Sequence, residues 1–201
     1  MKEIELKYVL EGEGAYQRLC EFLAPPVAEF DQVNHYFHTA DLAVPGPGGM
    51  IRVRVERGKT LFAVKLGGRL SGGVLSASEF EIELPKGDEF YRSSPQALWE
   101  AGNPGMELLE RECGAKVPLL WAGRLINHRA VFRWEHGCRL EADASLFPDG
   151  YKDYEVELET ASPEEHRASL VRLLESLGIP VRPQTKTKYQ RFLEHCRDKA
   201  P

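Results

Sequence analysis

Hydrophobic and polar residues alternate along several short stretches of this chain. In residues 2–10, three apolar side chains alternate with three charged ones, namely Ile4, Leu6 and Tyr8 with Glu3, Glu5 and Lys7. Successive side chains of a strand point to opposite faces, so this pattern predicts one apolar and one charged face. The same period predicts further strands over about 31–38, 50–56, 60–66, 78–84, about 125–134, 138–144 and 153–160.

Helical periodicity is confined to a few other segments: about 13–24, parts of 95–113, 163–177 and about 187–197. Pro163 follows the candidate cap Ser162, and Gly178 supplies a stop signal. Residues 43–49 predict a turn, and residues 66–73 predict a longer flexible loop. Antiparallel strands flanked by a few helices define an α+β class, and eight such strands can close into a β-barrel.

Composition and charge exclude several classes of protein. A formal net charge of −5 gives no overall basic surface, so a nucleic-acid partner is not expected. The scattered Cys20, Cys113, Cys138 and Cys196 have neither metal-ligand spacing nor a disulfide pattern, which is typical of the reducing cytoplasm. Apolar runs of membrane-spanning length are missing, so we expect no signal peptide and no membrane partner.

The charged faces are sorted by strand. Carboxylates fill those of 3–5, 79–83 and 155–159, whereas arginines fill those of 52–54 and 129–133. A plain solvated surface, the alternative interpretation, is served better by mixed signs. Segregation favours an enclosed lumen whose cations bind a polyanion and whose carboxylates bind the accompanying metal ions. The apolar faces would then pack outward against helices.

Taken in order, the charged blocks resemble a known family. They are Glu3-x-Glu5-x-Lys7, Gln32-x-Asn34-x-Tyr36-Phe37-x-Thr39-x-Asp41, Arg52-x-Arg54, Lys65, Glu79-x-Glu81, Arg129, Asp143, Glu155-x-Glu157 and Lys186-x-Lys188. This series resembles the CYTH superfamily of triphosphate tunnel metalloenzymes, which includes class IV adenylyl cyclases, thiamine triphosphatases and inorganic triphosphatases. The likeness runs from residue 1 to about 192, so residues 1–201 are expected to form a single CYTH-like domain.

The resemblance implies a closed eight-stranded antiparallel barrel that holds a triphosphate with Mg²⁺ or Mn²⁺, two ions per site. The implied metal ligands are the carboxylates Glu3, Glu5, Glu155 and Glu157, with Asp143 in an auxiliary or positioning role. The implied phosphate-binding residues are Lys7, Arg52, Arg54, Lys65, Arg129 and Lys186 or Lys188. Glu3, Glu5 and Lys7 are the implied catalytic group, and the segment from Lys186 helps to close the tunnel.

Some positions have two interpretations or depart from the family pattern. Glu79 and Glu81 either contact metal or form ion pairs with the arginines across the lumen. His38 stands where many relatives have Asp, and Ala77 stands where a relative commonly has Arg. Both departures bear on peripheral specificity rather than on the implied metal and phosphate ligands.

Three enzymatic functions and one binding function compete. We favour metal-dependent hydrolysis of a small triphosphate, most simply inorganic tripolyphosphate, by in-line attack of a metal-activated water on the terminal phosphate. The alternatives are an adenylyl cyclase and a thiamine or nucleoside triphosphatase. Class IV cyclases typically carry a His-Phe pair before the first motif, and only Met1 and Lys2 precede Glu3 here. A polyphosphate-binding module would not need both acidic pairs.

Overall fold

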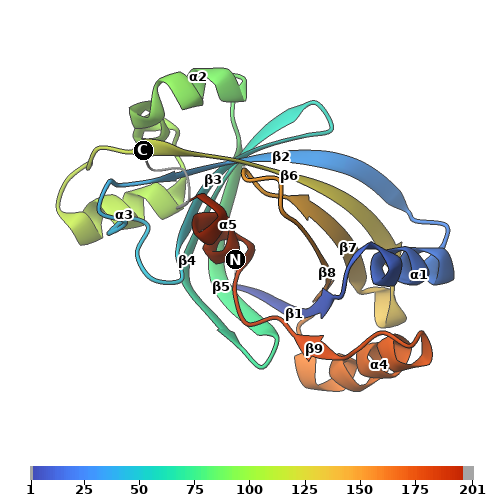
Figure 1. Ribbon diagram of the computed structural model, residues 1–201. Helices are drawn as coiled ribbons and strands as arrows, with labels where there is room; N and C mark the ends of the chain where they lie inside the picture. The colour runs from blue at the N-terminus through green and yellow to red at the C-terminus, as the bar shows by residue number, and fades with distance from the viewer. Residues whose placement is uncertain (1, 197–201) are drawn as a thin grey trace.

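A closed antiparallel barrel dominates the computed structural model, which describes residues 2–196 (Figure 1). Its eight strands are β1 (Lys2–Leu10), β2 (Ala28–His38), β3 (Met50–Glu56), β4 (Lys59–Ser71), β5 (Val74–Glu83), β6 (Leu120–Arg133), β7 (Arg139–Leu146) and β8 (Lys152–Glu159). They follow the order β5-β4-β3-β2-β6-β7-β8-β1, and pairing of β5 with β1 closes the ring. The short β9 (Arg182–Pro183) pairs with β1 beyond the end of β5. The predicted α+β barrel is therefore confirmed.

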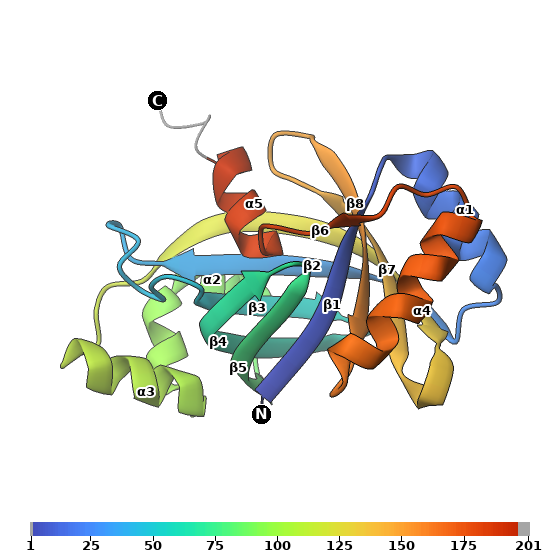
Figure 2. The same cartoon turned by 90° about the horizontal axis from the view of Figure 1, so that it is seen from below.

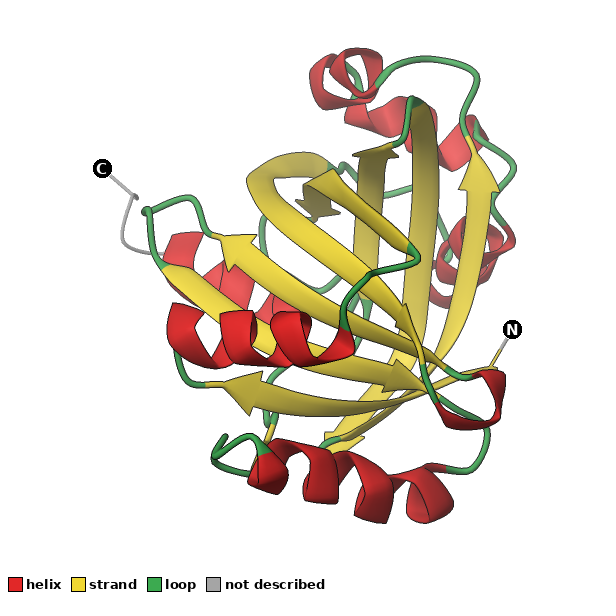
Figure 3. Ribbon diagram, turned by 90° about the vertical axis from the view of Figure 1, so that its right-hand side faces the viewer, coloured by secondary structure: helices red, strands yellow, loops and turns green. Residues whose placement is uncertain are grey.

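Helices cover the outside of the barrel and one of its ends (Figures 2 and 3). They are α1 (Glu13–Leu23), α2 (Asp88–Ser93), the 3₁₀ turn η1 (Pro95–Glu100), α3 (Pro104–Cys113), the 3₁₀ turn η2 (Glu135–Gly137), α4 (Pro163–Ser176) and α5 (Lys188–Cys196). Residue 197, the last of the predicted C-terminal helix, lies outside the described range. Ser162 precedes α4, but its side chain makes no capping hydrogen bond. Within residues 2–196, each helix is too short or too polar to cross a bilayer.

The apolar core lies between the barrel and its helices. On one side, Leu6 and Tyr8 of β1 pack in a cluster with Leu19 of α1 and Leu174 of α4. On another side, strands β2 to β4 pack against η1 and α3 through side chains such as Phe62. Burial of each such side chain contributes about 1.5–3 kcal/mol. Because the apolar positions face outward, the alternating charged positions must face the barrel interior.

Residues 66–73 correct one prediction, because they extend the β4–β5 hairpin instead of forming a flexible loop. The register shifts between Leu66 and Arg69, and pairing then continues to Ser71 opposite Val74. Gly72 and Gly73 have φ angles of 55° and 77°, which is the backbone that a two-residue hairpin turn requires. The Gly-rich composition therefore encodes a bulge and a tight turn.

The turn that precedes β3 touches this bulge through glycine backbones. The amide of Gly68 donates a hydrogen bond to the carbonyl oxygen of Gly48 at 2.9 Å. A β-carbon on Gly48 would lie 2.0 Å from the Gly68 oxygen, so a side chain cannot be accommodated there. Both glycines line the main cavity, and their contact closes part of its wall.

Candidate active site

The strand register places charged side chains of neighbouring strands beside one another inside the barrel. Lys7 of β1 lies opposite Glu157 of β8, which lies opposite Glu141 of β7. Lys65 of β4 lies opposite Glu79 of β5. Directly opposed residues have β-carbons about 4.5–5.5 Å apart, so side chains of opposite charge can meet.

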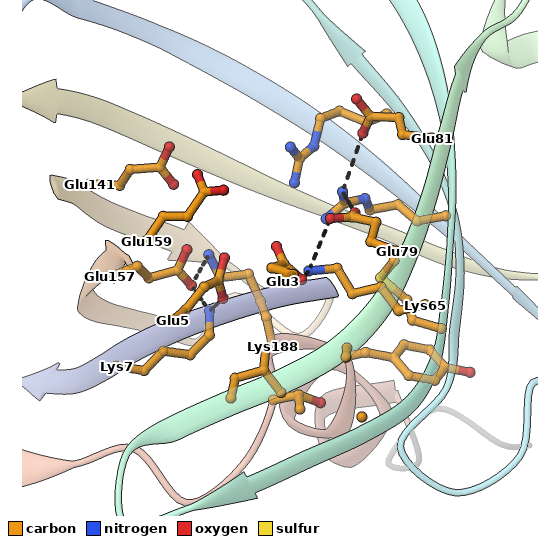
Figure 4. A pocket seen from close by; sticks show the side chains of 18 of the residues that line it. Glu3, Glu5, Lys7, Lys65, Glu79, Glu81, Glu141, Glu157, Glu159 and Lys188 are labelled. Atoms are coloured by element: carbon orange, nitrogen blue, oxygen red, sulfur yellow. Dashed lines mark hydrogen bonds and ion pairs between the residues drawn. The ribbon is translucent and has the colours of Figure 1, made fainter. Parts of the chain in front are cut away.

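These side chains line a cavity of about 250 Å³ inside the barrel (Figure 4). In the described part of the chain its carboxylates are Glu3, Glu5, Glu56, Glu79, Glu81, Glu141, Glu157 and Glu159. Its cationic side chains are Lys7, Arg52, Arg54, Lys65, Arg129, Arg139 and Lys188. Carboxylates and cations are nearly equal in number, so the cavity combines groups that attract metal ions with groups that attract anions.

Arg129 organises the wall formed by β6, β7 and β8. Its guanidinium forms two hydrogen bonds to Asp143, at 2.7 and 2.6 Å, and one to Glu157 at 3.0 Å. It also forms an ion pair with Glu141. Burial alone would raise the pKa of Asp143, but Arg129 and then Lys188 outweigh it and hold that pKa below its usual range. Asp143 is therefore ionised and already paired.

Lys7 extends this network to β1. Its ammonium lies 2.6 Å from Glu5 and also forms an ion pair with Glu157. Burial opposes the charged form of Lys7, yet the carboxylates of Glu157 and Glu5 raise its pKa well above the ordinary value. Figure 4 shows Lys7 and the two carboxylates directed toward one another in the cavity.

Glu3 and Glu5 have opposite protonation preferences. Burial and the neighbouring Glu5 carboxylate raise the pKa of Glu3 to about 8, although it forms an ion pair with Lys65. Burial also acts on Glu5, but Lys7 and Lys65 outweigh it and lower the pKa of Glu5 to about 2. Two carboxylates that repel each other inside a cavity share a proton or a cation more readily than they stay doubly ionised.

The opposite wall presents two arginines of β3 whose ion pairs are longer. Arg52 lies 3.5 Å from Glu79 and 3.9 Å from Glu81, and its buried Nε has no hydrogen-bond partner among the described residues. Arg54 donates to Asn34 at 2.8 Å. Burial, followed by the positive charges of Arg52 and Arg129, lowers the pKa of Arg54 to about 10. An anion at this place would stabilise all of these guanidinium groups.

The C-terminal segment contributes Lys188, the first residue of α5, whereas Lys186 precedes the helix and lies outside the cavity lining. The Lys188 ammonium lies 2.5 Å from Asp143 and 2.9 Å from Glu155. Lys186 is half exposed and pairs with Glu194 at 2.8 Å, outside the cavity lining. The remaining predicted site residues Glu3, Glu5, Lys7, Arg52, Arg54, Lys65, Glu79, Glu81, Arg129 and Glu157 line the cavity, and the buried Asp143 and Glu155 contact it through Lys188.

Two further residues, Glu141 and Arg191, belong to the site and are not among the residues predicted from the sequence. Glu141 joins Arg129 and Arg139, and alternation with Asp143 was the signal that could have identified it. Arg191 of α5 is buried against Glu155, and only its spacing from Lys188 hinted at this position. Of the two departures, Ala77 lines the cavity, whereas His38 lies outside the lining.

The residues present fit a divalent cation. Oxygen atoms of Asp143, Glu155 and Glu157 lie within 4.8 Å of one another, and all three side chains are buried. Carboxylate oxygens are the ligands that Mg²⁺ and Mn²⁺ prefer. The Glu3–Glu5 pair is a second group whose mutual repulsion a cation would relieve. An acidic cluster of suitable chemistry therefore exists inside the barrel.

Fold and site define a class of protein, an antiparallel barrel that encloses a cavity of alternating anion-binding and cation-binding groups. Comparison with family models then identifies the family, because the CYTH domain model matches residues 1–193. The chain therefore belongs to the CYTH family.

Individual relatives cover nearly the whole chain. "Putative triphosphatase YjbK" of Bacillus subtilis (strain 168) is 29% identical over 196 residues, which are 97% of this chain and 96% of the relative. The solved structure of Hippeastrum HpAC1, described as a "putative adenylyl cyclase" with a dominant triphosphatase activity, matches with a TM-score of 0.87 and 28% identity, over 96% of this chain and 95% of that chain. A "putative adenylate cyclase" from Bacillus halodurans matches with a TM-score of 0.71 and 26% identity, over 95% of this chain and 98% of that chain.

Proposed function

We propose that this chain is a cytoplasmic, divalent-metal-dependent triphosphatase whose preferred substrate is inorganic tripolyphosphate. The observation that carries the proposal is that one cavity is lined by Arg52, Arg54, Glu3, Glu5 and Glu157, with the buried Glu155 and Asp143 beside Glu157. The similarity to relatives named as triphosphatases supports the same reaction class.

Phosphate binding follows from the arginine wall. A tripolyphosphate carries about four negative charges near neutral pH, and its reaction depends mainly on positioning and charge neutralisation. Arg52 and Arg54 can each bind phosphate oxygens with two nitrogens, which lysine cannot do. Lys65, Arg129 and Lys188 would neutralise the remaining charge from neighbouring strands and from α5.

The two carboxylate groups would hold the metal ions, Glu3 with Glu5 and Glu155 with Glu157, assisted by Asp143. When bound, such ions neutralise phosphate charge and lower the pKa of a coordinated water. Lys7 keeps Glu5 and Glu157 in place between the two groups, because its ammonium pairs with both. In the reaction a water oxygen loses a proton to solvent and bonds to the terminal phosphorus, the bridging P–O bond breaks with its electron pair on the pyrophosphate oxygen, and phosphate and pyrophosphate leave.

The lining favours an inorganic substrate over one with an aromatic group. Tyr36 and Tyr189 are the cavity's aromatic side chains in the described part of the chain, and both are buried. Their ring centroids are 5.1 Å apart, and Tyr36 also packs at 4.6 Å against Phe192. These faces already contact one another, so a thiamine or adenine ring would have to displace them.

One parallel assay tests the proposal. Purified protein with Mg²⁺ or Mn²⁺ is offered tripolyphosphate, ATP and thiamine triphosphate, and phosphate, pyrophosphate and cyclic AMP are measured. We expect phosphate release from tripolyphosphate with the highest kcat/KM. Formation of cyclic AMP with pyrophosphate would replace hydrolysis by cyclisation. Tight binding of all three compounds without turnover would leave only a binding module.

Glu5→Gln provides the matched test of the carboxylates. The substitution should lower kcat at least about 10³-fold, because a neutral amide is a poor ligand for the cation. Glu83→Gln is the control, since Glu83 lies at the end of β5 and pairs with Lys59 at 2.7 Å outside the cavity lining. An unchanged rate in Glu5→Gln would rule out this carboxylate as a metal ligand.

A further inference from the structure

Arg191 is a buried cation of α5 that forms ion pairs with two carboxylates and one hydrogen bond to a backbone carbonyl. Its Nε lies 2.7 Å from Asp153 Oδ2, and its Nη2 lies 2.9 Å from Glu155 Oε2. Its Nη1 donates a hydrogen bond to the carbonyl oxygen of Lys186 at 2.8 Å. The residue is only 8% exposed. A guanidinium is the one cationic side chain that can serve three acceptors in a plane.

The two oxygens of Glu155 have different surroundings. Oε2 faces Arg191 and accepts a hydrogen bond of 3.4 Å from the side-chain Nε2 of Gln184. Oε1 lies 2.9 Å from the Lys188 ammonium. Glu155 is 1% exposed and shares a carboxylate group with Asp143 and Glu157. Arg191 therefore occupies one oxygen of Glu155 and leaves the other beside Lys188.

Arg191 also joins the start of α5 to β8. Asp153 and Glu155 are two positions apart on β8, so both present their carboxylates on the same face. The backbone amide of Arg191 bonds to the Thr187 carbonyl at 3.0 Å, while its side chain bonds to Lys186. This single side chain thus connects the strand with α5, which lies beside β6 (Figure 2).

We propose that Arg191 is a positioning residue, which orients Glu155 toward Asp143 and Glu157 and keeps α5 docked so that Lys188 reaches the same carboxylates. The inference rests on the proposed function in one respect, that this carboxylate group takes a divalent cation. Partners that orient a ligating carboxylate typically contribute a factor of about 10–100 to metal affinity.

Arg191→Lys is the diagnostic substitution, because it keeps the positive charge beside Glu155. A lysine has one nitrogen and cannot contact Asp153, Glu155 and the Lys186 carbonyl together. A change in metal affinity in this variant therefore reports geometry rather than net charge. A neutral residue at position 191 would leave the carboxylates with more uncompensated negative charge, which attracts Mn²⁺. The effects of charge and of geometry on metal affinity could then not be separated.

The experiment is a calorimetric titration of the full chain with Mn²⁺ in the absence of any triphosphate. We expect Arg191→Lys to bind Mn²⁺ about tenfold more weakly or worse. The control Arg182→Lys should bind within about twofold of the unaltered protein, because Arg182 is a largely exposed arginine paired with Glu11. Melting in EDTA verifies that each variant is folded at the titration temperature.

Steady-state kinetics separate positioning from a merely structural role. In Arg191→Lys the Mn²⁺ concentration for half-maximal rate should rise about tenfold, while kcat at saturating Mn²⁺ changes by less than about threefold. If this variant does not fold, Asp153→Glu replaces it, since it keeps the negative charge, displaces the carboxylate that contacts Arg191 Nε, and should weaken Mn²⁺ binding in the same direction.

Two outcomes distinguish this inference from the proposed function. Wild-type Mn²⁺ affinity in both Arg191→Lys and Asp153→Glu overturns the role of Arg191 and leaves the triphosphatase proposal intact. An unaltered protein that binds Mn²⁺ but hydrolyses no triphosphate overturns the proposed function. In that case the affinity difference between Arg191→Lys and Arg182→Lys still supports the positioning role.

Discussion

The arginines on two walls of the same cavity differ in how closely carboxylates contact them. On the paired wall, which we define as Lys7, Arg129, Glu141, Asp143 and Glu157, Arg129 contacts its carboxylates at hydrogen-bonding distance. On the open wall, defined as Arg52, Arg54, Glu79 and Glu81, the arginine–carboxylate distances of Arg52 are 3.5 and 3.9 Å. Arg52 is nevertheless 8% exposed, close to the 7% of Arg129 opposite, and Arg54 is partly buried.

The pKa shifts express the same difference. Burial opposes the charged form of Arg129, but Asp143 and Glu141 outweigh it and raise the pKa of Arg129 well above its usual value. Burial also opposes the charge of Arg54, and Arg52 and Arg129 add to that effect, so the pKa of Arg54 falls to about 10. The arginine of the paired wall is therefore stabilised by its own carboxylates, whereas the arginines of the open wall gain most from an added anion.

The largest expected effect concerns the stability of the paired wall. Arg129→Met leaves Asp143, Glu141 and Glu157 buried with one cation fewer, so the free energy of unfolding should fall by about 3–5 kcal/mol. Urea unfolding measures it. Arg133→Met on the same strand is the control, because Arg133 is exposed and should change stability by less than about 0.5 kcal/mol. Equal losses in the two variants would show that the ion pairs of Arg129 do not stabilise the paired wall.

Arg54→Met applies the same substitution to the open wall with the opposite expectation. Methionine relieves the repulsion among Arg52, Arg54 and Arg129, so the free energy of unfolding should stay the same or rise by up to about 1 kcal/mol. In contrast, kcat/KM for tripolyphosphate should fall at least about 100-fold, because a phosphate-binding guanidinium is lost. A destabilised but fully active variant would contradict both parts.

The two lysines of the C-terminal segment give a smaller and directly comparable effect. Lys188→Ala removes the ammonium that contacts Asp143 and Glu155, and KM for tripolyphosphate should rise about tenfold. Lys186→Ala removes a half-exposed partner of Glu194 and should change KM by less than about twofold. Steady-state kinetics at one fixed Mg²⁺ concentration decide between them. A larger effect of Lys186→Ala would mean that Lys186, and not Lys188, faces the cavity.

Much of the barrel could be predicted because period-two alternation is a local property. Most strands were expected within a few residues of their observed ends, and the outward apolar faces follow directly from that period. The 66–73 segment could not be predicted in the same way. Its glycines are compatible with a flexible loop, and only pairing of Arg69 to Ser71 with 74–76 makes it a hairpin. Which residues pair across two strands depends on the tertiary fold and is not encoded in the local sequence.

The site residues on strands could likewise be predicted from the sequence, whereas those near and on α5 could not. Alternating strands encode which face a residue occupies, so Glu5, Arg52 and Glu157 could be assigned to the lumen from sequence. Helix α5 carries no such signal, because its site residues depend on where the helix docks. Lys186 and Lys188 were therefore equivalent in sequence, and Arg191 was not selected, although the structure separates all three by their contacts.

The smallest expected effect lies on the outer face of the paired wall, at His128 next to Arg129. Its two ring nitrogens lie 2.8 Å from Asp31 and 3.0 Å from Glu29, and these hydrogen bonds outweigh burial and raise the pKa of His128. A histidine pKa that is higher in the folded than in the unfolded state stabilises the folded protein at pH values below the unfolded-state pKa. This stabilisation is lost as the pH rises through the folded-state pKa.

His128→Gln should therefore lower the free energy of unfolding by less than about 1 kcal/mol near pH 6, because the ring is partly exposed and the pairs are screened. The difference from the unaltered protein should shrink toward zero by about pH 8–9, where the imidazole is neutral in both states. Urea unfolding at both pH values, with metal chelated, measures it. If the difference in the free energy of unfolding grew with pH, titrating groups inside the lumen, and not His128 on the outer face, would cause the pH dependence.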